Sequence, residues 1–241
     1  FLMHKIKEKI SMKKLKRVLA LAMAVILSVP TIITTGMGTV PVKAAGDTVE
    51  LTVSSESAKY AGYETRKMYA GGNYAYCVQP SKKTPQSGTY EKHYDVENYV
   101  SNAGDETQAV QSRNLAYYCW GAPGFNASYF PSTWYDGSAM DDDKYIALSH
   151  IMLSFLVSYD EVGSMHGCNS SFKNWVYQNV LGYNANGELI NGQAPLPILC
   201  WTTAPASFKV YILSTGSATQ NILGYEYTPT GTVSLSKTSA N

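Results

Sequence analysis

The chain has 241 residues, of which 45% are hydrophobic and 15% are charged, and its formal net charge is +1. Residues 1–46 hold eight of the 19 Lys and Arg residues but only one of the 18 Asp and Glu residues. The remainder therefore carries 11 basic and 17 acidic residues, a net charge of −6. An acidic body of this kind argues against nucleic acid or an anionic membrane as a partner.

The N-terminal region predicts export. A basic run from Met12 to Arg17 precedes an almost unbroken apolar stretch from Val18 to Val29, and Ala44 closes a small-residue site that a peptidase could cleave. This pattern is typical of a secretory signal peptide, which we assign to residues 12–44. Residues 1–11 are expected to lie upstream of the true start or to be unstructured. The protein is therefore expected outside the cytoplasm.

All four cysteines follow this leader, at Cys77, Cys119, Cys168 and Cys200. In an oxidising compartment they could form two disulfides in any of three connectivities. Alternatively, one cysteine is kept apart for chemistry. The chain has no CxxC spacing and its histidines are scattered, so no metal or other cofactor is expected.

The first part after the leader predicts strands. Residues 49–53 alternate in polarity, and residues 60–78 are rich in Tyr and Gly with a turn at residues 70–73. The second strand of this hairpin carries Cys77. A polar loop is expected over residues 81–89.

The middle of the chain predicts helices, and the last part predicts strands again. The helix around His150, residues 145–157, is apolar on all sides, which indicates a buried helix. From Pro195 onward the character changes to β. The sequence thus predicts an α+β fold, a β-rich body with a helical insertion between the Cys77 strand and the His150 helix. The other expected elements are helices at 107–118 and 171–181, and strands at 208–213, 224–228 and 232–237.

Two segments carry a resemblance to a known family. Tyr76-Cys77-Val78 resembles the aromatic-Cys-aliphatic strand of the thioester domains found in Gram-positive surface adhesins, and the Ser149–Leu153 helix resembles their Thr-Gln-x-Ala-Ile-Trp helix. The resemblance covers most of residues 47–228. The strand from Gly231 to Lys237 resembles the opening of a SpaA or Cna-B type immunoglobulin-like stalk domain. Residues 229–241 are accordingly expected to begin a second domain, in which Lys237 could form an isopeptide bond.

The resemblance implies a particular chemistry. In such domains a cysteine thiolate and a glutamine carboxamide condense with loss of ammonia, and a partner amine can attack the resulting thioester. Here the glutamine position of the helix corresponds to His150. Imidazole has no acyl carbon, so a Cys77–His150 pair cannot form a thioester.

Three interpretations of this histidine stay open. Another amide is the acyl donor, with Gln108 and Gln111 better placed than Gln79; or the domain binds its ligand without a covalent bond; or Cys77 and His150 form a thiolate–imidazolium pair. Two simpler interpretations remain beside these. Cys77 is disulfide-bonded, and His150 is a hydrogen-bonded core residue.

The function predicted from these patterns is that of a secreted, wall-attached surface adhesin of a Gram-positive bacterium. Its partner would be a host or neighbouring-cell surface protein or glycan, and its wall attachment would come from a C-terminal region beyond Asn241. The alternatives are a cysteine hydrolase or transpeptidase, with Cys77 as nucleophile and His150 as base, and a structural cap on a stalk. The adhesin hypothesis expects Cys77 and His150 to lie close together, with Cys77 outside any disulfide.

Overall fold

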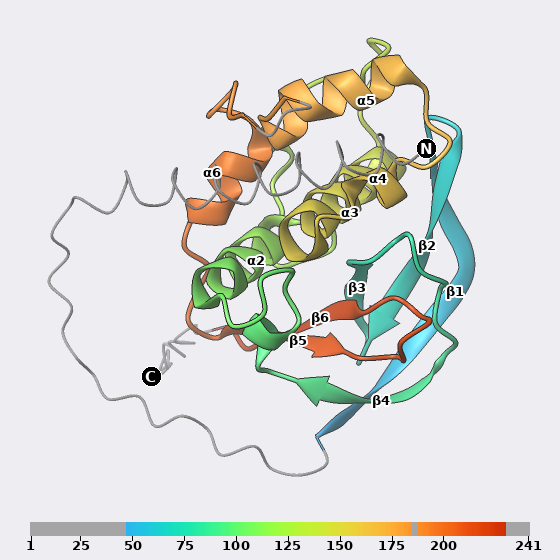
Figure 1. Cartoon of the computed structure of the whole chain (residues 1–241), viewed down its shortest axis with the longest axis vertical. Coiled ribbons are helices and arrows are strands. Elements are labelled where there is room, and N and C mark those ends of the chain that lie inside the picture. Colours follow the sequence, from blue (N-terminus) through green and yellow to red (C-terminus); the bar gives the residue numbers. More distant parts are fainter. Residues whose placement is uncertain (1–46, 185–187, 230–241) are drawn as a thin grey trace, which may run out of the picture.

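The computed structural model describes residues 47–184 and 188–229, in two layers (Figure 1). Six antiparallel strands close into a barrel in the order β1-β2-β3-β6-β5-β4, and helices pack on one side of it. The predicted leader and the strand expected at 232–237 lie outside the described residues. The strands are β1 Thr48–Tyr60, β2 Tyr63–Ala70, β3 Asn73–Cys77, β4 Gly88–His93, β5 Phe208–Leu213 and β6 Ile222–Tyr227.

Tight glycine turns set the register of the first three strands. Gly71 and Gly72 join β2 to β3 with φ values of 59° and 84°. Two successive positive φ values twist a two-residue hairpin in the direction that paired strands require. The side chains of β3 then alternate: Tyr74 and Tyr76 pack into the core beneath the helices, whereas Cys77 packs into the core inside the barrel.

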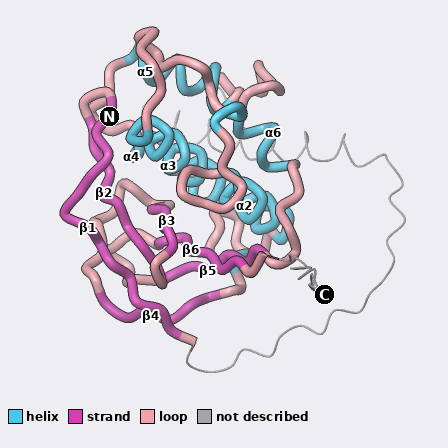
Figure 2. Tube along the Cα trace, turned by 180° about the vertical axis from the view of Figure 1, so that it is seen from behind, coloured by secondary structure: helices cyan, strands magenta, loops and turns pink. Residues whose placement is uncertain are grey.

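The helical layer is built around α3, Asp142–Ser158, in which every residue from Ile146 to Val157 is buried. The side chain of Asp141 caps its first turn by accepting a hydrogen bond from the Lys144 backbone N–H. The prediction of a buried helix around His150 is therefore confirmed. Figure 2 shows the same two layers from behind. The other helices are α2 Glu106–Tyr118, α4 Glu161–Ser164, α5 Ser170–Val176 with a π-helical turn at Tyr177–Leu181, and α6 Pro195–Trp201.

Two sequence-based expectations were wrong. The change to β structure expected at Pro195 does not occur there, because Pro195–Trp201 forms helix α6. A proline in the first turn costs a helix no hydrogen bond, since the first N–H groups have no intrahelical acceptor. Conversely, the end of the loop expected over residues 81–89 belongs to strand β4, Gly88–His93. None of the residues of this strand is fully buried. A strand without a buried face has no apolar alternation to reveal it.

The apolar residues form two cores. The larger lies between the barrel and the helices, and Phe172, Leu199 and Phe208 are among its fully buried members. The smaller fills the barrel interior with Leu51, Met68, Ala70, Ala75, Cys77, Tyr211, Leu213 and Ile222. The α+β class predicted from sequence is confirmed. Among the described residues, no helix has the combination of length and apolarity that a bilayer crossing requires.

Candidate functional site

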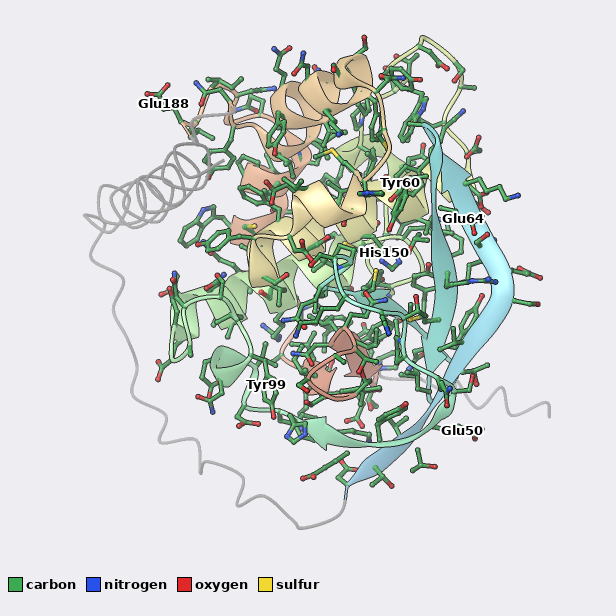
Figure 3. All side chains as sticks on the ribbon, turned by 45° about the vertical axis from the view of Figure 1, so that its right-hand side comes forward. Glu50, Tyr60, Glu64, Tyr99, His150 and Glu188 are labelled. Carbon is green, nitrogen blue, oxygen red and sulfur yellow. The ribbon has the colours of Figure 1, made fainter. Side chains whose placement is uncertain are left out.

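Cys77 and His150 meet where β3 ends beneath α3. The Cys77 Sγ atom lies 2.9 Å from His150 Nδ1, and the hydroxyl of Tyr74 lies 3.2 Å from His150 Nε2. Thr65 Oγ1 is a further neighbour of the sulfur at 3.7 Å. His150 lies where α3 faces the strands (Figure 3). The predicted proximity of Cys77 and His150 is confirmed, and both ring nitrogens of the histidine have a polar contact.

Burial keeps both members of this pair uncharged. It raises the pKa of the Cys77 thiol to about 12, against a smaller lowering by the hydrogen bond with Thr65. It also lowers the pKa of the His150 imidazole to about 4. Each shift disfavours the charged form of its group. At neutral pH the site therefore holds a thiol and a neutral imidazole, so the burial energetics do not favour the thiolate–imidazolium pair considered from sequence.

A cavity of about 280 Å³ opens onto this pair. Cys77 is 3% exposed and His150 is 1% exposed, so both lie at its inner end. The mouth is formed by exposed side chains from β2 and from the loop after β3. The remaining lining residues are Tyr60, Tyr63, Glu64, Thr65, Arg66, Met68, Pro80, Lys82, Lys83, Thr84, Ser164 and Gln220.

Gln220 is the cavity residue that the sequence did not single out. It lies just before β6 and is 4% exposed, and its side-chain Oε1 has no hydrogen-bond partner among the described residues. Cys77 pairs with Ile222, and the Val78 N–H donates to the Asn221 carbonyl. Continuing this register sets Gln220 diagonally opposite Cys77, at a typical Cα separation of about 7–8 Å that a long side chain can bridge.

The three glutamines considered from sequence are placed differently. Gln79 accepts a hydrogen bond from the Asn221 N–H through Oε1. Gln108 donates through Nε2 to the Ser101 hydroxyl and to the Leu156 carbonyl. Neither of these residues lines the cavity, and neither does Gln111 on α2. Gln108 and Gln111, which the sequence placed ahead of Gln79 as acyl donors, therefore do not share the cavity with Cys77.

Aromatic rings surround His150 on the side away from the cavity. The Tyr74 and Tyr76 rings lie edge-on to the imidazole, with centroid separations of 5.9 and 5.7 Å. Trp120 packs on Tyr74 in turn, at 5.1 Å. These rings shield the pair from solvent. Tyr145 packs elsewhere, against Phe125 and Phe130.

All four cysteines are buried free thiols, so the disulfides that the sequence allowed are not present, and the prediction that Cys77 lies outside any disulfide is confirmed. The described residues contain no group of three or more histidine, cysteine or acidic side chains that could hold a metal ion. The cavity thus brings together the Cys77 thiol, the His150 imidazole and the Gln220 carboxamide. These groups offer a nucleophile, a base and an acyl carbon.

Comparison with protein families matches residues 48–186 to the family described as thioester domain. The matched segment contains Cys77 and His150 and ends before Gln220. No curated protein and no solved structure matches the chain. Because the match spans more than half of its 241 residues, the chain belongs to the thioester domain family.

Proposed function

We propose that this is the ligand-binding domain of an exported surface adhesin, and that Cys77 and Gln220 form its internal thioester. The observation that carries this proposal is the shared cavity. The Gln220 amide is buried there, its oxygen has no hydrogen-bond partner among the described residues, and it lies on the segment leading into β6, which runs beside Cys77. His150, which the sequence resemblance placed at an acyl-donor position, then has a different role.

The bond-forming step needs no outside reagent. The Cys77 sulfur attacks Cδ of Gln220, so that an S–C bond forms and the C–N bond breaks. His150 Nδ1 takes the thiol proton and returns it to the departing nitrogen, which leaves as ammonia. When the thiol donates a hydrogen bond to Nδ1, the neutral ring carries its own proton on Nε2. That N–H can donate a hydrogen bond to the Tyr74 hydroxyl. The Tyr74 contact is compatible with the tautomer that can act as a base.

The capture step reverses the proton path. A partner amine attacks the thioester carbonyl, an amide bond forms, and the S–C bond breaks. His150 accepts a proton from the amine and passes it to the leaving sulfur, restoring the Cys77 thiol. The deep position of the sulfur and the aromatic surround limit competing hydrolysis, because water reaches the carbonyl only through the cavity.

The cysteine hydrolase or transpeptidase stays as a second candidate because His150 contacts both a thiol and an orienting hydroxyl, Tyr74. Against it, burial raises the pKa of the thiol and leaves it protonated at rest. Thioester domains act by covalent binding, which also favours capture over turnover. Repeated turnover of a small ester that is lost in Cys77→Ala would favour the enzyme.

The remaining features of the adhesin proposal come from sequence alone. They are export through residues 12–44, a stalk domain beginning at residues 229–241 with a bond-forming Lys237, and attachment to a Gram-positive cell wall. The ligand class proposed on the same basis is a surface protein or glycan of a host or neighbouring cell.

The test is the intact mass of the purified protein. We expect it to be lower than the sequence mass by one ammonia, with the loss replaced by one methylamine after treatment with that amine. Cys77→Ala and Gln220→Ala should both show the full mass of their sequences, whereas Gln193→Ala, an exposed glutamine, should keep the loss. A full mass in the unaltered protein would overturn the thioester. A loss that survives in Gln220→Ala would assign it to another acyl donor.

A further inference from the structure

The mouth of the cavity has a charge opposite to that of the rest of the domain. Arg66, Lys82 and Lys83 line it with a single acid, Glu64, and all four side chains are exposed. Within the described part of the chain, none of the three cations forms a salt bridge. The chain beyond the predicted leader carries a net charge of −6, so this cationic rim stands out against an acidic body.

We propose that the cavity captures a lysine side chain presented on an acidic peptide segment. This inference rests on the proposed function, since it names the substrate of the Cys77–Gln220 thioester. Its second support is the Gln220 side chain, which is buried and lines the cavity, and whose Oε1 finds no hydrogen-bond partner in the part of the chain that the structure describes. The rim and the buried amide belong to the same cavity.

The depth of the site selects a nucleophile on a long stem. Cys77 and Gln220 are only 3% and 4% exposed, so an amine must pass the rim to reach the bond between them. Lysine carries its amine on a flexible four-carbon chain. The rings of Tyr60 and Tyr63, packed edge-on at 5.8 Å, line the cavity and offer apolar surface to that chain.

The rim charge selects what surrounds the lysine. Three cations repel an approaching ammonium group, so a lysine among basic or neutral residues is disfavoured at the mouth. Acidic neighbours reverse this by pairing with Lys82 and Lys83, and they raise the rate of encounter. The same cations favour loss of the proton from the lysine amine, which is the form that attacks a carbonyl.

The experiment compares two peptides of equal length, each with one central lysine, one flanked by glutamates and one by arginines. Covalent adducts are followed by intact mass on the purified protein, with methylamine as a probe of the thioester alone. We expect the acidic peptide to react at least about 10-fold faster at low salt, and the ratio to shrink at high salt. The double variant Lys82→Glu/Lys83→Glu should reverse the preference. Lys209→Glu, an exposed change on β5, should leave it intact.

The outcomes separate this inference from the proposed function. If methylamine gives no adduct, the thioester itself is absent and the proposed function fails. If methylamine reacts normally but the two peptides react at equal rates, or the double variant keeps the original preference, the peptide specificity is wrong while the thioester stands. Adducts with phosphatidylethanolamine vesicles but with neither peptide would overturn it in favour of a lipid amine.

Discussion

Two neighbouring residues of α3 each contact a cysteine, and the two cysteines lie in very different surroundings. His150 contacts Cys77 at the inner end of the cavity. Ser149, one residue earlier, hydrogen-bonds Cys119 in the large core. Burial raises the pKa of both thiols to about 12, so their ionisation is suppressed alike. Only Cys77 faces a base, an amide and an opening to solvent.

This contrast shows that a buried cysteine is not marked as reactive or inert by its pKa alone. What distinguishes Cys77 is the set of groups that it faces. The Ser149 hydroxyl accepts a hydrogen bond from the Trp120 backbone N–H, which fixes the turn after α2. In the proposed mechanism, His150 instead moves a proton to and from the sulfur. Adjacent residues of α3 therefore have different roles: Ser149 acts in packing and His150 in the proposed chemistry.

The largest expected effect comes from exchanging the base. His150→Leu keeps a side chain of similar size and supplies no acyl carbon, but it removes proton transfer, so thioester aminolysis should slow by about 10²–10⁴-fold. In the unaltered protein, the aminolysis rate constant, calculated from the concentration of unprotonated amine, should not change with pH near neutrality. It should fall as pH is lowered through about 4, where the imidazole becomes protonated.

Ser149→Ala is the matched control for this change, because Ser149 is equally buried and lies beside His150 on the same helix. It should lower stability without changing the aminolysis rate. Equal slowing in both variants would show that helix packing, and not the imidazole, sets the rate.

The large core offers the next effect, on stability alone. Leu199 on α6 is fully buried among the helices, and Leu199→Ala should lower the free energy of unfolding by about 2–5 kcal/mol. Urea unfolding measures this loss. The mass deficit of the folded variant should be unchanged, since Leu199 does not line the cavity. Loss of the thioester in a folded Leu199→Ala protein would instead tie the two regions together.

A substitution at Glu161 is expected to have a smaller effect, and to raise the free energy of unfolding rather than lower it. Burial raises the pKa of this carboxyl, and its Oε2 lacks a partner among the described residues while the Tyr177 hydroxyl donates to Oε1. With a raised folded pKa, its contribution to stability is present in acid and is lost as pH rises through that pKa. Glu161→Gln should therefore stabilise the protein by about 1 kcal/mol at neutral pH.

Urea unfolding of Glu161→Gln at two pH values checks this sign. The gain should vanish below the ordinary glutamate pKa, where both side chains are neutral. Destabilisation at neutral pH would mean that the carboxylate has a stabilising partner.

The smallest effect is expected at the surface between the layers. Lys67 on β2 lies 3.5 Å from Asp143 on α3 and 3.8 Å from Glu56 on β1. Both are partly exposed pairs, so Lys67→Ala should cost less than about 1 kcal/mol in urea unfolding. A larger loss would show that charge pairs, and not apolar burial, hold α3 on the barrel.

The sequence predicted those elements whose pattern is local. The apolar run around His150 and the turn at residues 70–73 gave helix α3 and the β2–β3 hairpin. Gln220 could not be found in this way, because its place beside Cys77 depends on β3 pairing with β6, a contact between distant parts of the chain. Its one signal is an amide two residues before an apolar strand. The charged residues at the cavity mouth likewise come from β2 and from a loop, and no local sequence pattern specifies where that loop lies.

The closed barrel affects how neighbouring copies of the protein could associate. Each of its six strands has two partners, because β1 pairs with both β2 and β4. This closure is confined to one end of the barrel, because β4 pairs with β1 only over Thr48–Leu51, whereas Ser57–Tyr60 of β1 pairs with β2 alone. At the closed end the backbone groups of these strands are already paired, so they offer neighbouring copies no edge for strand-to-strand association.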